Sequence, residues 1–358
     1  MHKSNETILE VNLSTLEKNY NYLRSKLNHK TSIIGVIKAY GYGHGDIKIA
    51  KKLEEIGVNI FWVADFEEGI SLRNGGIKSK IIVANPGIKS YDYIIRNKLD
   101  VVIHNLDLLE FYCSIKNNIN IHLKFNTGMN RYGFDFHEID DVVEKLKSHN
   151  QLKIVSICSH LSSANFDKNN TEKQIFDFEK IALKVEHKLN YKLKKHILNS
   201  NGLLNFNTKQ YDYVRLGISL FGGCQDPNLE QISRLTSVVS QNRNVDQGSC
   251  IGYEPSFIAP KKMNVSIIPI GYADGLNRRL GNGVGIVKIN EKSCPILGNV
   301  CMDSIMVDTS SVKCKLGDKV EIFGPNNSIL SLSEKLQTIP YEIYSTLNRR
   351  IKRVYFEN

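Results

Sequence analysis

The residues whose types could do chemistry begin with a lysine at the end of an apolar run. Residues 33–37 read Ile-Ile-Gly-Val-Ile, which predicts a strand buried on both faces, and Lys38 ends it. Burial lowers the pKa of such a lysine, and its neutral amine can attack a carbonyl to form a Schiff base. The glycines at 41, 43 and 45 let the backbone approach a ligand, and the Tyr42 hydroxyl could reach a phosphate. An ordinary strand end with a solvated lysine explains this stretch equally well.

Two later stretches offer partners for a phosphate. If Lys38 forms a Schiff base, the simplest partner is an aldehyde cofactor such as pyridoxal 5'-phosphate (PLP). Ser200 supplies a hydroxyl, and Gly217 and Ile218 supply backbone N–H groups at a predicted helix start, shortly after Arg215. Serine or glycine after a strand is common in any barrel, but the two stretches together favour a phosphate site.

A second lysine also ends an apolar run. Lys124 is followed seven residues later by Arg131, which could bind a carboxylate through two hydrogen bonds. Two solvated cations in a loop explain these residues equally well. Neighbouring cations repel each other, so one of the two should point away or be modified.

Eight short apolar runs alternate with helical patterns, which is typical of βα units. The runs are residues 33–37, 60–64, 80–84, 101–104, 121–125, 154–159, 196–198 and 213–215. They predict an α/β protein with an N-terminal (β/α)8 TIM-type barrel over residues 1–233; an open doubly wound sheet is the alternative. Lys38, Lys124, His160, Ser200 and Arg215 fall at the predicted carboxyl ends of strands, where a barrel gathers its catalytic residues.

Residues 234–358 change to short β-rich runs with glycine turns, which predict a mostly-β second domain. Residues 1–12 could add a strand to it. A first helix is expected from a capping box at Ser14 and Glu17 to about residue 27, and a last helix over residues 331–347.

The composition, 41% hydrophobic and 23% charged, is that of a soluble globular protein. The net charge of +10 is spread over lysine-rich segments, and no nucleic-acid motif accompanies it, so we expect neither nucleic acid nor membrane as a partner. The first residues lack the apolar core of a signal peptide, and the seven cysteines show no paired spacing. We therefore expect a cytoplasmic protein with reduced thiols and no metal site.

Taken in order, the motifs resemble the alanine racemase family, and the matches run across nearly the whole chain. The matching stretches are 36–45 (Val-Ile-Lys-Ala-Tyr-Gly-Tyr-Gly-His-Gly), 122–131, 159–161, 196–200, 214–218, 252–253, 270–275 and 300–303. The resemblance implies PLP-dependent interconversion of L-alanine and D-alanine by two bases, supplying D-alanine for peptidoglycan. Lys38 would carry PLP and act on D-alanine, and Tyr253 would act on L-alanine. Because that tyrosine comes from the second subunit in the family, a homodimer with a shared active site is implied.

The resemblance also implies roles for the remaining residues. Arg215 would face the pyridine nitrogen, and His160 would lie against the cofactor ring. The phosphate would be held by Tyr42, Ser200, Gly217 and Ile218. Arg131 and Met302 would contact the substrate, and Lys124 matches a lysine that the family carbamylates.

Several positions depart from the family pattern. Tyr40 and Gly41 replace a usual Asn-Ala, Asn126 replaces an aspartate, Leu216 replaces a proline, and Arg349 stands where many members have tyrosine. Arg349 leaves the substrate range open, so a racemase of another small amino acid such as serine is one alternative. A non-catalytic PLP-binding protein and an amino-acid decarboxylase of related architecture are others.

Overall fold

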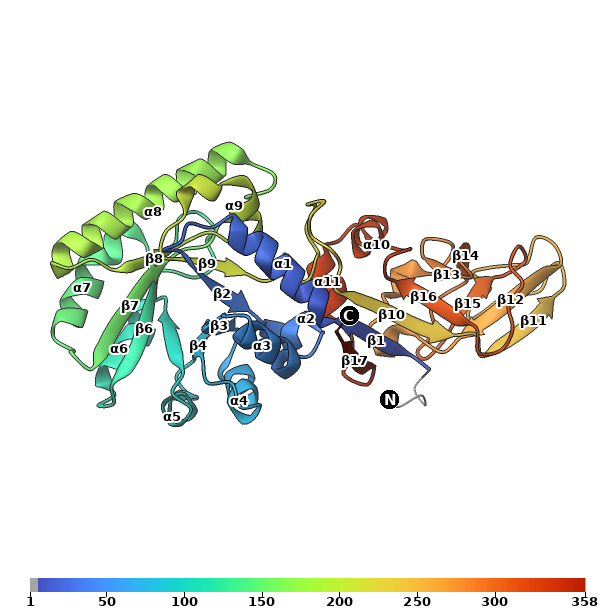
Figure 1. The fold of residues 1–358 in the computed structure, drawn as a ribbon, viewed down its shortest axis with the longest axis horizontal. Helices are drawn as coiled ribbons and strands as arrows, with labels where there is room; N and C mark the ends of the chain where they lie inside the picture. The colour runs from blue at the N-terminus through green and yellow to red at the C-terminus, as the bar shows by residue number, and fades with distance from the viewer. Residues whose placement is uncertain (1–5, 358) are drawn as a thin grey trace. The chain divides into compact units, whose positions relative to one another are not determined.

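The computed structural model describes residues 6–357. The chain divides into two compact units (Figure 1). The barrel unit comprises residues 20–41 and 46–219; the sheet unit comprises the chain up to Asn19, Tyr42–Gly45 and everything from Leu220 onward. The domain boundaries 1–233 and 234–358 stay a prediction.

The barrel unit contains eight strands, all parallel to their neighbours, in the order β8-β7-β6-β5-β4-β3-β2-β9. They are β2 (Ser32–Val36), β3 (Ile60–Val63), β4 (Lys80–Val83), β5 (Asp100–Ile103), β6 (Ile119–Lys124), β7 (Leu152–Cys158), β8 (Lys194–His196) and β9 (Tyr213–Leu216). A backbone hydrogen bond of 3.0 Å from Arg215 N to Leu198 O joins the two ends of the sheet. The predicted (β/α)8 barrel is confirmed, nearly closed.

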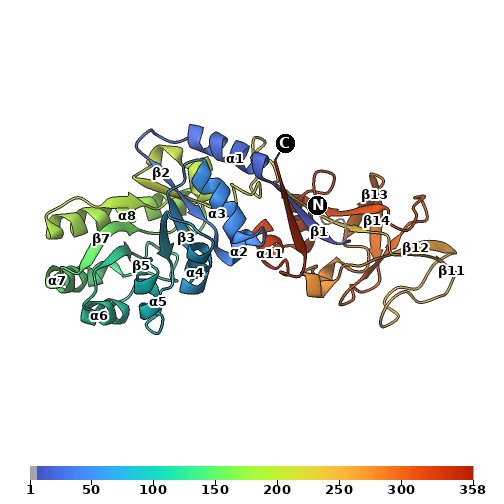
Figure 2. The ribbon, with the colours of Figure 1, turned by 60° about the horizontal axis from the view of Figure 1, so that its bottom comes forward.

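Helices lie around the outside of these strands (Figures 1 and 2). They are α3 (Asp46–Glu55), α4 (Phe66–Asn74), α5 (Tyr91–Arg96), α6 (Leu106–Ser114), α7 (Ile139–Lys147), α8 (Lys168–Leu189) and α9 (Ser200–Asn205), with the 3-10 turns η1 (Phe136–Glu138) and η2 (Asn207–Lys209). Side-chain caps start several of them: Asp65 accepts from Glu68 N at 3.0 Å, and Asn105 accepts from Leu108 N at 2.7 Å. The loops that join β3 to α4 and β5 to α6 are therefore only two residues long.

The first helix, α1 (Leu13–Ser25), begins differently from the prediction. The side chain of Asn12 accepts from Ser14 N at 3.0 Å and from Thr15 N at 3.1 Å, so Asn12 is the cap and not Ser14. Asparagine and serine cap equally well, and the strand β1 (Ile8–Asn12) runs straight into the helix, which moves the cap two residues earlier.

The sheet unit is mostly β-structure, as predicted, with nine strands in the order β11-β12-β15-β14-β13-β16-β10-β1-β17. Besides β1 they are β10 (Ser233–Val238), β11 (Gln241–Val245), β12 (Met263–Ile268), β13 (Ile286–Ile289), β14 (Lys292–Leu297), β15 (Ile305–Asp308), β16 (Lys319–Phe323) and β17 (Lys352–Phe356), with the 3-10 turns η3 (Tyr272–Asp274) and η4 (Arg278–Leu280). β1 pairs antiparallel with β10 and parallel with β17.

The helix expected over residues 331–347 is present but interrupted. Two helices stand there, α10 (Ile329–Leu336) and α11 (Pro340–Ser345). Gln337 adopts a left-handed conformation (φ 53°) that ends the first, and Pro340 opens the second, where its missing N–H is not needed.

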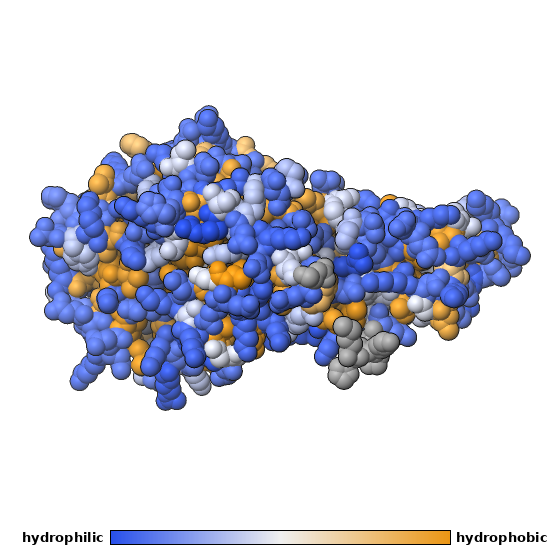
Figure 3. Space-filling view, viewed as in Figure 1, coloured by the Kyte–Doolittle hydropathy of each residue, from blue (hydrophilic) through white to orange (hydrophobic). Residues whose placement is uncertain are grey.

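Hydrophilic residues cover most of the face shown in Figure 3. Among the described residues, no helix is long and apolar enough to cross a membrane.

Candidate active site

The barrel brings the predicted polar residues to the carboxyl ends of its strands. Lys38 follows β2 by two residues, Lys124 is the last residue of β6, and Ser200 comes shortly after β8. Arg215 lies within β9, and Gly217 directly follows that strand. These ends meet at one mouth of a parallel barrel, as expected from the sequence.

A left-handed turn follows Lys38 at once. The (φ, ψ) angles are 52°, 52° at Ala39, 57°, 44° at Tyr40 and 61°, 45° at Gly41, within α2 (Lys38–Tyr42). Glu68 on α4 holds this turn, because its carboxylate accepts from Ala39 N at 2.6 Å and from Ala64 N at 2.7 Å. L-residues are strained in this conformation, so a turn of this kind needs such support.

The turn gives a reason for the glycine at 41. A Cβ there would lie 3.2 Å from both Cα and N of Asp46, so glycine relieves both a close contact and the strain of a positive φ. Neither the turn nor the part played by Glu68 was predicted from the sequence, because isolated positive-φ residues other than glycine leave no signal in the residue pattern.

The environment of Lys38 favours its neutral amine. Desolvation lowers the pKa of Lys38, and the charges of Arg131 and Arg215 lower it further, while Glu68 opposes them. The side chain still keeps exposed surface at the mouth of the barrel unit. A reachable lysine whose pKa is lowered in this way is suited to nucleophilic attack on a carbonyl.

The pKa of Lys124 is lowered more strongly. Desolvation, followed by the charges of Arg215, Arg131 and Lys38, lowers its pKa to about 8 against an opposing effect of Cys158. Its Nζ lies 5.5 Å from the centre of the Tyr132 ring. Lys124, Arg131 and His160 line the same small pocket, so the crowding of cations expected from the sequence is present.

Arg215 is buried, and most of its hydrogen-bond donors have acceptors. Its Nη1 donates to Nδ1 of His196 at 2.5 Å, and its Nη2 donates to Ser159 O at 2.6 Å and to Nδ1 of His160 at 3.1 Å. No described residue accepts a hydrogen bond from its Nε, and its guanidinium carbon lies 5.4 Å from the centre of the Trp62 ring. Desolvation and the Arg215 charge hold the pKa of His160 well below its usual value, so His160 is neutral.

A second group of donors surrounds Ser200. The backbone N–H groups of Gly217 and Ser219 both point at its Oγ, each at 3.3 Å, and Oγ of Ser219 lies 2.8 Å away. Ile218, between the two N–H groups, is buried. Both hydrogen bonds from the backbone N–H groups to Ser200 Oγ are long. Two amides and two hydroxyls are therefore gathered at one place. Ser219 was missed from the sequence; its spacing from Gly217 was the available signal.

Three predicted residues belong to the sheet unit. Tyr42 is buried there against Phe221, with ring centres 4.9 Å apart. Tyr253 and Met302 are 70% and 53% exposed, unusual for an aromatic and a methionine in a folded unit. Arg349, after α11, is exposed.

Two family models match the chain: "Alanine racemase, N-terminal domain" over residues 11–225 and "Alanine racemase, C-terminal domain" over residues 232–355. The chain belongs to the alanine racemase family. Curated members of the family include alanine racemase of Fusobacterium nucleatum, 36% identical over 97% of this chain and 99% of its own, and alanine racemase 1 of Caldanaerobacter subterraneus, 34% identical over 98% and 95%.

Solved alanine racemase structures have the same fold. The Clostridium difficile 630 enzyme superimposes with a TM-score of 0.92 at 29% identity, covering 99% of this chain and 97% of its own. The Bartonella henselae enzyme, a structure with covalently bound pyridoxal phosphate, superimposes with a TM-score of 0.89 at 29% identity, covering 98% of this chain and 100% of its own.

One departure from the alanine racemase pattern has a clear structural reason. Asn126 Oδ1 accepts from Gly128 N and Asn130 N, both at 3.1 Å, while its Nδ2 donates to the carboxylate of Asp135 at 3.0 Å. An aspartate at 126 could not donate and would repel Asp135. The amide therefore suits the loop that carries Arg131 in this member of the family.

Proposed function

We propose that the protein interconverts L-alanine and D-alanine with PLP as its cofactor. The observation that carries the proposal is Lys38 at the carboxyl end of a barrel strand, with its pKa lowered by desolvation and by Arg131 and Arg215. The family membership over the full chain supports the reaction.

The residues of the barrel unit fit PLP in two ways. Among residues 6–357, Arg215 has one donor without a partner, Nε–H, in an otherwise satisfied guanidinium, as a ring nitrogen acceptor would require. Ser200, Ser219 and the N–H of Gly217 form a group of donors that suits a phosphate. We propose that these residues hold the cofactor together with Tyr42 and Ile218, and that His160, which is neutral, lies against the ring.

Bound PLP would supply an electron-withdrawing ring that makes the Cα–H of an attached amino acid acidic. Racemisation removes a proton from one face of Cα and returns one to the other, so two bases suit it better than one. We propose that Lys38 Nζ moves the proton on the face used by D-alanine and Tyr253 Oη the proton on the face used by L-alanine. Arg131 and Met302 would contact the substrate. Arg131 would bind the carboxylate of the substrate amino acid.

We propose a homodimer in which Tyr253 completes the active site of the partner subunit. The exposure of Tyr253 and Met302 on the sheet unit supports this, because apolar surface of this kind is typical of an interface. No cysteine within residues 6–357 forms a disulfide, which fits the cytoplasmic location that we also propose.

Racemisation assays over the small L- and D-amino acids, with PLP added, test the proposed activity. We expect kcat/KM for alanine in both directions to exceed that for serine by about tenfold or more, since a hydroxyl adds polar atoms that an alanine site leaves unpaired. The two curated relatives named above are alanine racemases, which favours alanine racemisation over a serine racemase or a non-catalytic PLP protein. Equal rates with serine, or no racemisation of alanine with PLP bound, would contradict the proposal.

Lys124 is proposed to carry a carbamate. With a pKa of about 8, roughly a tenth of Lys124 is neutral at pH 7, and only the neutral amine adds carbon dioxide. Carbamylation would convert one of the crowded cations into an anion beside Arg131. We expect protein equilibrated with 13C-bicarbonate to show a carbamate carbon by NMR that is absent in Lys124→Ala.

The matched control is Lys145→Ala, which removes a partly exposed lysine that pairs with Glu110 at 3.5 Å and should leave the signal unchanged. If the carbamate signal persists in Lys124→Ala, the modified amine is not that of Lys124.

A further inference from the structure

A line of buried polar side chains runs through the barrel unit away from Arg215. His196 lies between Arg215 and Ser156: its Nδ1 is 2.5 Å from Arg215 Nη1, and its Nε2 is 3.0 Å from Ser156 Oγ. Ser156 Oγ is also 2.7 Å from Nδ1 of His122. Nε2 of His122 is 3.5 Å from Oδ2 of Asp100, and neither of these two buried atoms has a hydrogen-bond partner among the described residues.

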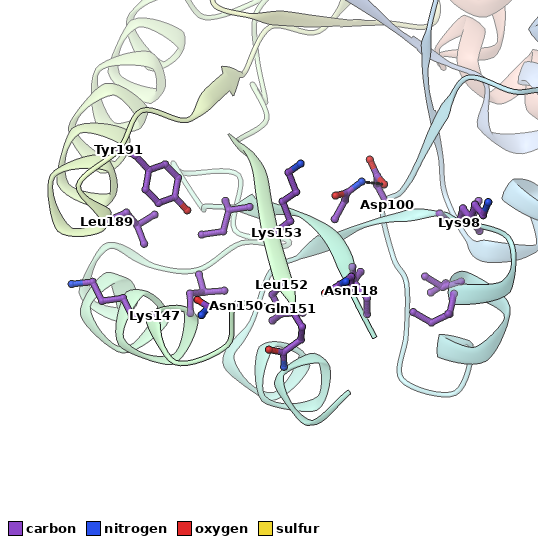
Figure 4. Close-up of a pocket in the computed structure, with 17 residues that line it drawn as sticks. Lys98, Asp100, Asn118, Lys147, Asn150, Gln151, Leu152, Lys153, Leu189 and Tyr191 are labelled. Carbon is purple, nitrogen blue, oxygen red and sulfur yellow. Dashed lines mark hydrogen bonds between the residues drawn. The ribbon is translucent and has the colours of Figure 1, made fainter. Parts of the chain in front are cut away.

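The line joins opposite ends of the barrel. Asp100 is the first residue of β5, whereas Arg215 lies near the carboxyl end of β9. Asp100 borders a pocket of about 820 Å³ beside the amino ends of the strands (Figure 4). Its other oxygen accepts from Asn120 at 2.9 Å, which fixes the carboxylate.

The two charged ends set the direction of every hydrogen bond between them. Arginine only donates, so Nδ1 of His196 must accept and the proton of His196 must sit on Nε2. That proton goes to Ser156 Oγ. Because Ser156 is fully buried and its hydroxyl has only the two imidazoles as partners among the described residues, its own proton must go to Nδ1 of His122. His122 then carries its proton on Nε2, facing the Asp100 carboxylate.

A neutral His196 is consistent with its surroundings. Desolvation, the Arg215 charge and His122 hold the pKa of His196 well below its usual value. Reversing any one bond of the line would place two donors against each other at Arg215 or leave a buried proton without an acceptor, and a buried donor without an acceptor is unfavourable.

We propose that Asp100, His122 and Ser156 are positioning residues that act on Arg215 through His196. They hold His196 in the tautomer that accepts from Nη1 and so keep the remaining donor of Arg215, Nε–H, aimed at the cofactor site. The role of Arg215 toward the cofactor rests on the proposed function. The expected tautomers of His122 and His196 are independent of that function.

The tautomers are measured first, on the full-length protein with 15N-labelled histidine, by long-range 1H–15N correlation spectra with and without PLP. We expect two neutral histidines protonated on Nε2, assigned to His122 and His196 because Ser156→Ala removes the hydroxyl contact of both and shifts both signals. Finding either histidine protonated on Nδ1, or doubly protonated, overturns the proposal.

The effect on Arg215 is measured on Ser156→Ala and Asp100→Asn with PLP bound. We expect the visible absorption band of the bound cofactor to shift and kcat for alanine to fall by about tenfold, with KM changed less than threefold, because Arg215 acts on the ring and not on the substrate. The controls are Ser333→Ala, a buried serine whose hydroxyl donates to Leu330 O, and Asp140→Asn, an exposed carboxylate paired with Lys184 and Lys188. Both control variants should have the same absorption band, kcat and KM as the unmodified protein.

The outcomes separate the two proposals. A lowered melting temperature with an unchanged band and unchanged kcat means that the line is only structural and overturns the positioning role. If the unmodified protein binds PLP but does not racemise alanine, the proposed function fails, while the predicted tautomers and the shifted band in the two variants still support the positioning role.

Discussion

Replacing Lys38 with alanine should lower kcat for alanine racemisation by at least about 10⁴-fold in both directions. The expected loss is large because the proposal gives this one amine two tasks, holding the cofactor and moving the proton on one face of Cα. The visible absorption of lysine-bound PLP should disappear in the same variant. Racemisation is measured by the change in optical rotation, starting from each enantiomer.

Lys38→Arg is the matched variant. It keeps a cation beside Glu68 and a long side chain at the start of the left-handed turn, but arginine is not deprotonated at ordinary pH. We expect it to be as inactive as Lys38→Ala while melting close to the unmodified protein. Full activity in either variant would show that another residue carries out both tasks.

Replacing Tyr253 with phenylalanine should remove only one of the two bases. We expect racemisation to fall by about 10³-fold in both directions, within the range that a general base contributes, while PLP stays bound. Because Lys38 remains, deuterium from solvent should still exchange into Cα of D-alanine without inversion, but not into L-alanine. An unchanged rate in both directions would contradict the two-base assignment.

Mixing the two inactive variants tests the shared site directly. In a mixed dimer of Lys38→Ala and Tyr253→Phe, one site carries both substitutions and the other carries neither. Subunit exchange at equal amounts should therefore restore about a quarter of the unmodified activity, since half the dimers are mixed and each has one intact site. Native mass spectrometry of isotope-labelled Lys38→Ala mixed with unlabelled Tyr253→Phe demonstrates the exchange. No recovery despite demonstrated exchange would place Lys38 and Tyr253 of one subunit in the same site.

The barrel could be predicted because its signal is periodic. Strand β3, for example, is buried at every position and reads as a continuous apolar run. The placement of Lys38, Lys124 and Arg215 at the mouth followed from that pattern alone. Their roles still depend on the experiments above.

Features that depend on three-dimensional contacts could not be predicted in this way. Arg353 reads as part of a basic surface run, yet it is buried on β17 and donates to backbone oxygens of Gly43, Leu347, Asn348 and Ile351. A fully satisfied arginine and a solvated one look alike in a sequence. The same holds for the line from Asp100 to Arg215, because its members are far apart in the chain and no local spacing connects them.

The turn after Lys38 has a further consequence, which concerns chirality. The angles at Ala39 (φ 52°, ψ 52°) are nearly the mirror image of an ordinary right-handed helix, and a D-residue prefers that mirror region. L-Alanine is strained there by roughly 1–2 kcal/mol, whereas D-alanine would be relaxed. A chemically synthesised chain with D-alanine at 39 would keep every atom type and bond of the protein. Comparing this chain with the ordinary protein would therefore show the effect of the backbone strain at Ala39 while the chemistry of Lys38 stays the same.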